Sequence, residues 1–251
     1  MIAREYIGPA GTAFPGIQSQ WNGYDQYEFN VEGRLCRVVV PQKPAKGKPW
    51  SWRMVFWDAF ANSEVALLEK GYHVAFIDCS DWLGSPTRMK QCEAFFRFLT
   101  EEYGLSKKPV LIGMSRGGFC AFRWAVLHPD KVSCLYVDNP RFNFADMPWK
   151  HADLWKQYLQ AWELPDDLDV SKFPNPLDTF QPLIEKKVPI LSVCGEADAI
   201  VSFERNTKLF AEKFETAGGI IEVIAKSGVD HHPHGLDDPV PIVNFILKNT
   251  K

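Results

Sequence analysis

Between residues 109 and 118 the chain reads Pro-Val-Leu-Ile-Gly-Met-Ser-Arg-Gly-Gly. The apolar run that opens this segment is typical of a buried strand, and apolar residues recur at helical spacing from Phe119 to Leu127. Gly113 and Gly117 allow a sharp turn from the strand into the helix, so Ser115 is expected at the apex. A serine in that position can act as a nucleophile when a neighbouring base takes its proton, and the N–H groups that begin the helix can stabilise an oxyanion.

The composition is that of an ordinary globular protein. Of the 251 residues, 46% are hydrophobic and 24% are charged, and the formal net charge is −3. This length predicts one domain of α/β type over residues 1–251. Lys and Arg are not gathered into a basic stripe, so a nucleic-acid partner is not expected. No apolar run approaches the roughly 18 residues of a membrane span, and the first residues lack the apolar core of a signal peptide. We therefore expect no membrane partner and a cytoplasmic location.

The six cysteines are expected to be reduced thiols. None belongs to a C-x-x-C pair, and most fall within apolar strand or helix patterns, where a thiol packs as a small hydrophobic group. Metal binding through cysteine is accordingly not expected. The cysteines occupy positions 36, 79, 92, 120, 134 and 194.

Apolar strand patterns alternate with helical patterns through most of the chain, which predicts a largely parallel sheet with helices on both faces. The start differs, because residues 26–31 and 35–41 flank Glu32-Gly33-Arg34 and are predicted to form an antiparallel hairpin. An irregular stretch over about 141–187 is predicted to be a short cap insert. Further strands are predicted at 52–57, 72–78, 109–112, 132–137, 188–194 and 220–226, and helices at 63–70, 89–103, 119–128, 203–217 and 240–248.

Two later segments contain the groups that an activated serine requires. Residues 194–201, Cys-Gly-Glu-Ala-Asp-Ala-Ile-Val, leave the end of a predicted strand, and residues 228–235, Gly-Val-Asp-His-His-Pro-His-Gly, follow the last strand. The C-terminal ends of parallel strands meet at one edge of a sheet, so both segments are expected beside Ser115. Asp198 is the leading candidate for the carboxylate, and His231 for the base that the carboxylate orients.

These motifs give the chain a resemblance to the α/β-hydrolases over nearly its whole length. Residues 113–117 resemble the nucleophile elbow of that family. Asp198, in a G-x-x-D-x-x-V pattern, resembles the acid that follows the seventh strand, and His231 resembles the histidine after the last strand. The chain order Ser, Asp, His is also that of the family. The resemblance implies the α/β-hydrolase fold and a Ser-His-Asp acyl-enzyme mechanism that needs no cofactor.

A narrower resemblance concerns the substrate. Trp50-Ser51-Trp52-Arg53 and the histidine cluster over 231–234 resemble small bacterial hydrolases described as acetyl-xylan-esterase-like or carbohydrate-esterase-like. This resemblance implies a small-molecule ester as the partner, either an acetylated carbohydrate or another small acyl ester. Two other classes remain open: a peptidase or amidase with the same triad, and a non-catalytic binding protein on the same fold.

The family pattern is interrupted at the oxyanion hole. The histidine-glycine segment that usually follows the third strand of esterases is absent, and residues 53–58, Arg-Met-Val-Phe-Trp-Asp, stand there instead. The elbow implies the N–H of Arg116 as the first oxyanion donor. The second donor is expected around Trp57.

Other residues compete with Asp198 for the role of the acid. Glu196 is a weaker rival, because it lies closer to the strand and can point away from the base. Asp138 ends the strand over 132–137, and some α/β-hydrolases place their acid after that strand. Asp198 itself can also be read as a cap for the helix that begins near Phe203.

Three histidines within four residues leave the identity of the base open between His231 and His232. His234 lies beyond Pro233 and is expected to brace the loop. A metal site is not expected, because the proline and the absence of helical i, i+4 spacing weigh against one, and no carboxylate stands at a known zinc spacing.

The remaining histidines and the aromatic residues of the cap are interpreted mainly as structural. His73 lies within a strand pattern and is expected in the core. His128 ends a helix, and His151 lies in the cap, where it can face a substrate. Most cap aromatics are expected to pack against one another, with one or two lining a pocket: Phe142, Phe144, Trp149, Trp155, Tyr158 and Trp162.

Overall fold

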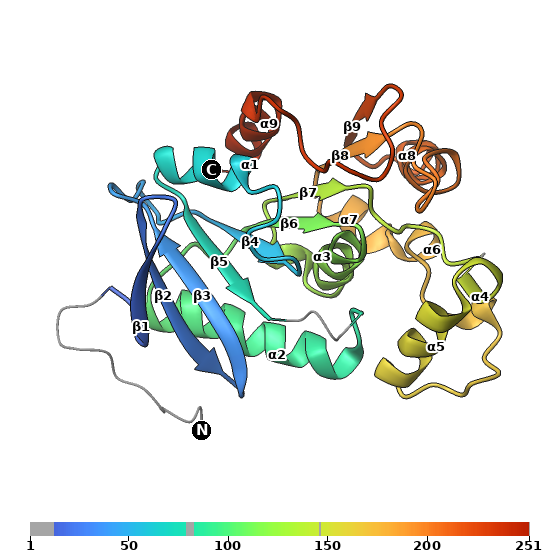
Figure 1. Ribbon diagram of the computed structural model, residues 1–251, viewed down its shortest axis with the longest axis horizontal. Coiled ribbons are helices and arrows are strands. Elements are labelled where there is room, and N and C mark those ends of the chain that lie inside the picture. The colour runs from blue at the N-terminus through green and yellow to red at the C-terminus, as the bar shows by residue number, and fades with distance from the viewer. Residues whose placement is uncertain (1–12, 79–82, 146, 251) are drawn as a thin grey trace.

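The computed structural model describes residues 13–78, 83–145 and 147–250. Strands in these residues form one sheet in the order β1-β2-β3-β5-β4-β6-β7-β8-β9 (Figure 1). Pairing is antiparallel from β1 to β5 and parallel from β5 through β4 to β9. The predicted mostly parallel sheet with a leading antiparallel hairpin is therefore confirmed. The strands are β1 (Ile17–Trp21), β2 (Tyr24–Val31), β3 (Arg34–Val40), β4 (Trp50–Met54), β5 (His73–Ile77), β6 (Val110–Met114), β7 (Cys134–Asp138), β8 (Ile190–Gly195) and β9 (Ile221–Lys226).

Two strand predictions near the start of the chain need correction. β1 is missing from the predicted strands. Its sequence shows no apolar alternation, and four of its five residues are exposed in the structure. β4 ends at Met54 rather than at Trp57. Val55 and Phe56 have φ values of +61° and +48°, in the left-handed region, so the backbone turns away from the strand there. The turn is not evident from the sequence, because residues 54–57 are all apolar or aromatic and are typical of a continued strand.

Helices cover both faces of the sheet (Figure 1). Apolar side chains of α2, α3 and α8 pack against one face in a core that contains Trp50, Trp52 and Trp124. Those of α1 and α9 pack against the other face. The predicted helices 89–103 and 203–217 each combine an α-helix with a π-helical turn, Phe98–Glu102 in the first and Glu204–Lys208 in the second. The α-helices are α1 (Asn62–Glu69), α2 (Pro86–Arg97), α3 (Arg116–Leu127), α4 (Met147–Lys150), α5 (Ala152–Ala161), α6 (Pro176–Thr179), α7 (Gln181–Glu185), α8 (Leu209–Thr216) and α9 (Val240–Asn249).

The stretch predicted as a cap, 141–187, has two parts. α4, α5 and the loop that follows them enclose an aromatic cluster, which also contains Phe119 of α3. Trp162 Nε1 donates to the carbonyl of Leu83 over 2.8 Å and so ties this part to the main body. α6 and α7 instead pack on α3 as part of the helical layer. Most cap aromatics are buried, as expected, whereas Trp149 is 74% exposed.

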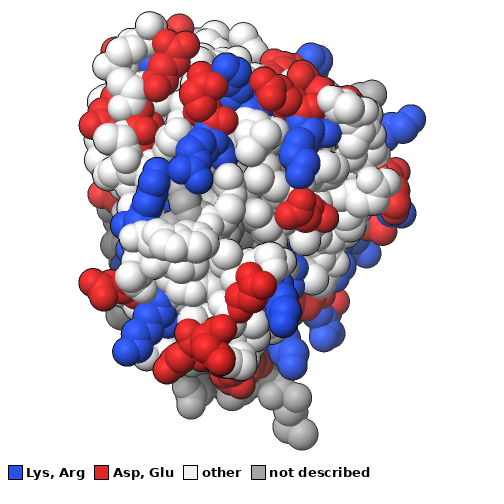
Figure 2. Space-filling model, turned by 90° about the vertical axis from the view of Figure 1, so that its right-hand side faces the viewer, with Lys and Arg blue, Asp and Glu red and all other residues white. Residues whose placement is uncertain are grey.

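Other expectations concern thiols, membranes and surface charge. Five cysteines are buried thiols, and Cys79 lies outside the described residues. Within residues 13–78, 83–145 and 147–250, no helix combines the length and the apolar character needed to cross a membrane. On the face shown in Figure 2, acidic and basic side chains are interspersed rather than segregated by sign.

Candidate active site

Ser115 occupies the turn between β6 and α3. Its φ of +51° and ψ of −119° are rare for a residue that carries a side chain, so the turn holds backbone strain. The turn is fixed from both sides, because Ser115 N donates to Asp138 O over 2.8 Å and Gly118 N donates to Ser115 O over 3.0 Å. Ser115 is only partly buried. The strand–turn–helix context predicted for this serine is therefore present.

Glycine is required around this turn for close backbone approach. A Cβ on Gly113 would overlap the backbone of Gly117, and a Cβ on Gly117 would overlap the carbonyl oxygen of Met54. At Gly118 a Cβ would lie 2.8 Å from the Cβ of Pro140. The missing side chains thus let the start of α3 pack directly on the ends of β4 and β6.

The structure brings Ser115, His231 and Asp198 together. Ser115 Oγ lies 3.1 Å from His231 Nε2, and His231 Nδ1 lies 2.7 Å from Asp198 Oδ2. The Asp198 side chain is fully buried. Its Oδ1 accepts hydrogen bonds from the N–H groups of Ile200 and Val201 at 2.8 and 2.7 Å. Asp198 therefore contacts the imidazole and also holds the start of its own loop.

Two polar residues that no sequence motif identifies hold the histidine loop. Asn139 Nδ2 donates to His231 O over 2.9 Å, while its Oδ1 accepts from Gly195 N over 2.8 Å. Asp230 Oδ1 accepts from Ala199 N and from His231 N, at 2.9 and 2.7 Å. These two N–H groups lower the pKa of Asp230. The sequence feature that could have identified Asn139 is its position directly after strand β7, where a polar residue is expected to face the site.

Asp138 belongs to a second carboxylate–imidazole pair. Its Oδ1 accepts from His234 Nδ1 over 2.6 Å, and its Oδ2 accepts from Gly235 N over 2.8 Å. Both the Asp138 carboxylate and the His234 ring are buried. His234 thus braces the loop, and Asp138 contacts His234 rather than His231. Glu196, the other rival acid, is exposed.

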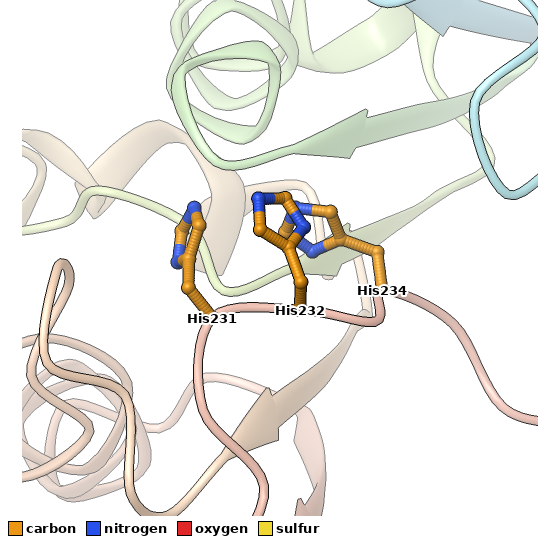
Figure 3. A group of neighbouring side chains, drawn as sticks. All are labelled: His231, His232 and His234. Atoms are coloured by element: carbon orange, nitrogen blue, oxygen red, sulfur yellow. The ribbon is translucent and has the colours of Figure 1, made fainter.

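His231, His232 and His234 project side by side from the loop after β9 (Figure 3). One nitrogen from each imidazole lies within 4.8 Å of the corresponding nitrogen of the other two. His232 is exposed, and its ring stacks on Phe60 with the centroids 6.0 Å apart. Partial burial, together with the two neighbouring imidazoles, lowers the pKa of His232. Although no metal site is predicted from the sequence, the loop gathers three potential metal ligands.

The segment after β4 lies beside the elbow. The guanidinium of Arg116 is 5.0 Å from the centroid of the Phe56 ring. The Trp57 side chain packs instead on Trp21 and Phe76, with centroid separations of 5.2 and 5.3 Å. Only the backbone of Trp57 is therefore relevant to an oxyanion hole, and its role as a donor stays a prediction.

A buried ion pair anchors this segment. Arg53 Nε lies 3.0 Å from Glu64 Oε1, and both side chains are only 2% exposed. Arg53 also donates to the carbonyl of Ala59, and the hydroxyl of Ser63 donates to Glu64 Oε2 over 2.7 Å. Nothing in the sequence pattern identifies this pair, because the two residues belong to a strand and a helix that are adjacent only in the fold.

The other histidines lie apart from these groups. His73 is buried in β5, and burial lowers its pKa to about 4. His128 Nε2 lies 3.6 Å from Glu93 Oε2 at the end of α3, and partial burial lowers its pKa. His151 is half-buried and directly precedes α5. The expected core position of His73 is confirmed.

Comparison with known proteins points to the same architecture. The family model described as alpha/beta hydrolase fold matches residues 55–188, a little over half of the chain. The structure is similar to that of Porphyromonas gingivalis dipeptidyl peptidase 4, with a TM-score of 0.68 and 16% identity, covering 92% of this chain and 36% of that chain. Est1E from Butyrivibrio proteoclasticus gives a TM-score of 0.64 and 15% identity, covering 89% of this chain and 98% of that chain.

A third similar structure is that of Pyrococcus horikoshii acylaminoacyl peptidase. It gives a TM-score of 0.62 and 14% identity, covering 82% of this chain and 37% of that chain. The present chain thus spans only a little over a third of either peptidase. No curated protein matches the sequence. At 14–16% identity, the three structural likenesses show a shared fold and nothing finer.

Proposed function

Since this chain belongs to the α/β hydrolase fold family, we propose that it is a serine hydrolase that cleaves carboxylic esters through an acyl-enzyme. One observation carries the proposal: Ser115 Oγ, His231 and Asp198 form a chain of two contacts, 3.1 and 2.7 Å long. A serine needs this arrangement to become a nucleophile, because its hydroxyl ionises only when a base removes the proton.

In the proposed mechanism, Ser115 Oγ attacks the carbonyl carbon of the ester while His231 Nε2 takes the hydroxyl proton. The bond to the alcohol oxygen then breaks, and His231 gives the proton to the departing alcohol. A water molecule, deprotonated by the same nitrogen, attacks the acyl-enzyme and releases the acid and Ser115. Asp198 accepts the Nδ1–H of His231, which fixes the tautomer and stabilises the imidazolium. These steps require no cofactor.

The proposed oxyanion hole consists of two backbone N–H groups, from Arg116 and from Trp57. Arg116 is the first residue of α3, where N–H groups lack partners within the helix. The turn at Val55 and Phe56 supports a donor in the segment after β4, because it ends the strand beside the elbow. Each such donor contributes about 10²- to 10³-fold to the rate.

Ester cleavage is proposed ahead of peptide cleavage because of how much of each similar protein the match covers. Est1E, whose name marks it as an esterase, is covered over 98% of its length, whereas the two peptidases hold most of their residues outside the match. The narrower resemblance of residues 50–53 and 231–234 to carbohydrate-esterase-like hydrolases makes acetylated sugars a specific substrate proposal.

The test is a panel of p-nitrophenyl acyl esters of rising chain length, run beside the matched p-nitroanilides and followed by acetylated sugars. We expect the short-chain esters to be hydrolysed much faster than the anilides. A fluorophosphonate probe should label Ser115 stoichiometrically, with Ser115→Ala as the control. Faster anilide cleavage would instead assign a peptidase or amidase. A chain that neither turns over esters nor reacts with the probe would be a binding protein on this fold.

A further inference from the structure

We propose that His231, His232 and His234 form a site for a divalent transition-metal ion such as Zn²⁺, and that the bound ion inhibits the enzyme reversibly. One nitrogen from each ring lies within 4.8 Å of those of the other two (Figure 3). Three imidazoles from one loop are a donor set that zinc accepts readily, with water in the remaining position. Inhibition rests on the proposed function, whereas binding of the ion does not.

Two of the three imidazoles already contact carboxylates, as metal-ligating histidines commonly do. His231 Nδ1 is 2.7 Å from Asp198 Oδ2, and His234 Nδ1 is 2.6 Å from Asp138 Oδ1. A ligating histidine almost always donates its other ring N–H to a carboxylate or carbonyl, which fixes the tautomer and raises ligand basicity. In both rings this leaves Nε2, with its lone pair, for an ion.

His232 is the ligand whose ring can move most easily toward an ion. Zn–N bonds of about 2.0–2.1 Å place two tetrahedral ligand nitrogens roughly 3.4 Å apart. The present nitrogens lie up to 4.8 Å apart, so the rings must move closer together. His231 and His234 are buried and held by carboxylates, whereas His232 is exposed and its contacts are with other rings, those of Phe60, His231 and His234. Rotation of that one ring can therefore bring its nitrogen toward the other two, and a small approach of His231 to His234 completes the site.

The donor set also limits the choice of ion. Neutral imidazole suits Zn²⁺, Cu²⁺ and Ni²⁺, whereas Mg²⁺ and Ca²⁺ prefer oxygen ligands. The carboxylates of Asp198 and Asp138 already accept from the Nδ1 atoms, so they are not free to favour the harder ions. Magnesium is therefore a matched negative control.

Inhibition follows from the identity of one atom. Ser115 Oγ lies 3.1 Å from His231 Nε2, the nitrogen that must take the serine proton in the proposed mechanism. The same lone pair cannot both bind an ion and accept that proton. Occupation of the site thus removes the base and leaves the serine hydroxyl protonated. Removal of the ion restores the enzyme with no change in covalent structure.

The experiment titrates the zinc-free chain with Zn²⁺ alone by calorimetry and follows the initial rate on a short-chain p-nitrophenyl ester at each zinc concentration. Visible ligand-field bands of added Co²⁺ report the coordination geometry. His232→Ala is the test variant, because its ring is exposed, and His128→Ala at the end of α3 controls for loss of a histidine. Each variant is compared with its own zinc-free rate.

We expect one zinc ion per chain, binding that weakens roughly tenfold or more in His232→Ala but not in His128→Ala, and inhibition that tracks occupancy and is reversed by a chelator. Magnesium should not inhibit. Equal zinc affinity in wild type and His232→Ala would overturn the site. Zinc binding without inhibition, or with a faster rate, would overturn the inhibitory role. If the zinc-free chain neither hydrolyses esters nor reacts with a fluorophosphonate, the proposed function fails while the titration still decides the metal site.

Discussion

His234 Nδ1 donates to Asp138 Oδ1 over 2.6 Å, so the carboxylate at the end of β7 is held by a histidine other than the one that faces Ser115. Two histidine–carboxylate pairs thus lie next to each other, with the rings of His231 and His234 5.0 Å apart. Only the pair of His231 with Asp198 continues to the serine. This geometry separates a pair proposed to act in catalysis from one that braces the loop.

Asp198→Asn should therefore lower kcat much more than Asp138→Asn. An amide at position 198 favours the wrong imidazole tautomer, and the expected loss is on the order of 10⁴-fold. Asp138→Asn alters the contacts with His234, Gly235 and the Tyr136 hydroxyl but none with His231, so we expect a loss within about tenfold. Glu196→Gln, at an exposed position, is the matched control. Steady-state kinetics on a short-chain ester check the order, and a larger loss for Asp138→Asn would move the acid to β7.

Ser115→Ala should remove nearly all ester hydrolysis and leave the fold intact. Triad residues act as a unit, so loss of the nucleophile is expected to cost on the order of 10⁴-fold or more. The backbone strain at this turn, with φ of +51°, is the same for alanine as for serine, so the melting temperature should change little. Activity within tenfold of wild type, in a sample that melts normally, would sink the assignment of the nucleophile.

His231→Ala should abolish ester hydrolysis, whereas His232→Ala should lower it only modestly. His231 Nε2 is 3.1 Å from Ser115 Oγ, while the exposed His232 ring stacks on Phe60. The loss at position 231 should match that of Ser115→Ala within an order of magnitude, because the two act in one step. Rates measured in a chelator exclude metal effects. An inactive His232→Ala together with an active His231→Ala would instead identify His232 as the base.

Much of the site is predictable because its parts are tied to regular elements. The elbow is a short motif whose glycines are demanded by close backbone contact, as at Gly113 and Gly117. Asp198 and the histidine loop follow parallel strands, and such ends meet at one edge of a sheet. Local pattern and topology therefore agree on Ser115, Asp198 and His231 as neighbours, which is the arrangement found.

Features that depend on distant backbone contacts are not predictable in the same way. Lys226 Nζ donates to the carbonyls of Pro233 and Gly235, at 2.6 and 3.0 Å, and so helps to set the shape of the histidine loop. No spacing rule contains those bonds, so the convergence of three imidazoles is not apparent from the sequence. The early end of β4 escapes prediction for a similar reason, because left-handed residues such as Val55 carry no glycine signal.

Glu64→Gln should destabilise the protein strongly. Glu64 and Arg53 are each 2% exposed, and the substitution leaves a buried guanidinium without its counter-charge. Breaking one side of such a pair costs about 3–5 kcal/mol in the free energy of unfolding. Glu93→Gln, in a partly exposed pair with Lys131, is the control and should cost no more than about 1 kcal/mol. Urea unfolding of the two variants at neutral pH checks the difference, and equal losses would contradict the buried pair as an anchor.

His73→Leu should make the protein less sensitive to acid. Burial lowers the pKa of His73 to about 4, whereas a histidine in the unfolded chain titrates near ~6.5. Between these values the unfolded chain binds a proton that the folded protein does not, so the free energy of unfolding falls as the pH falls. The loss amounts to about 2 kcal/mol between roughly pH 7.5 and pH 5, and it is absent above the unfolded value.

The measurement is urea unfolding of wild type and His73→Leu at those two pH values, with His151→Leu as a control for the loss of a half-buried histidine. Leucine fills the buried position in β5 without a group that must stay neutral, so its presence removes this one contribution to the acid response. The expected result is a smaller drop in unfolding free energy for His73→Leu than for wild type or His151→Leu, by about 2 kcal/mol. An identical drop in all three proteins would mean that His73 takes up its proton equally well in the folded and unfolded chain, contrary to its burial.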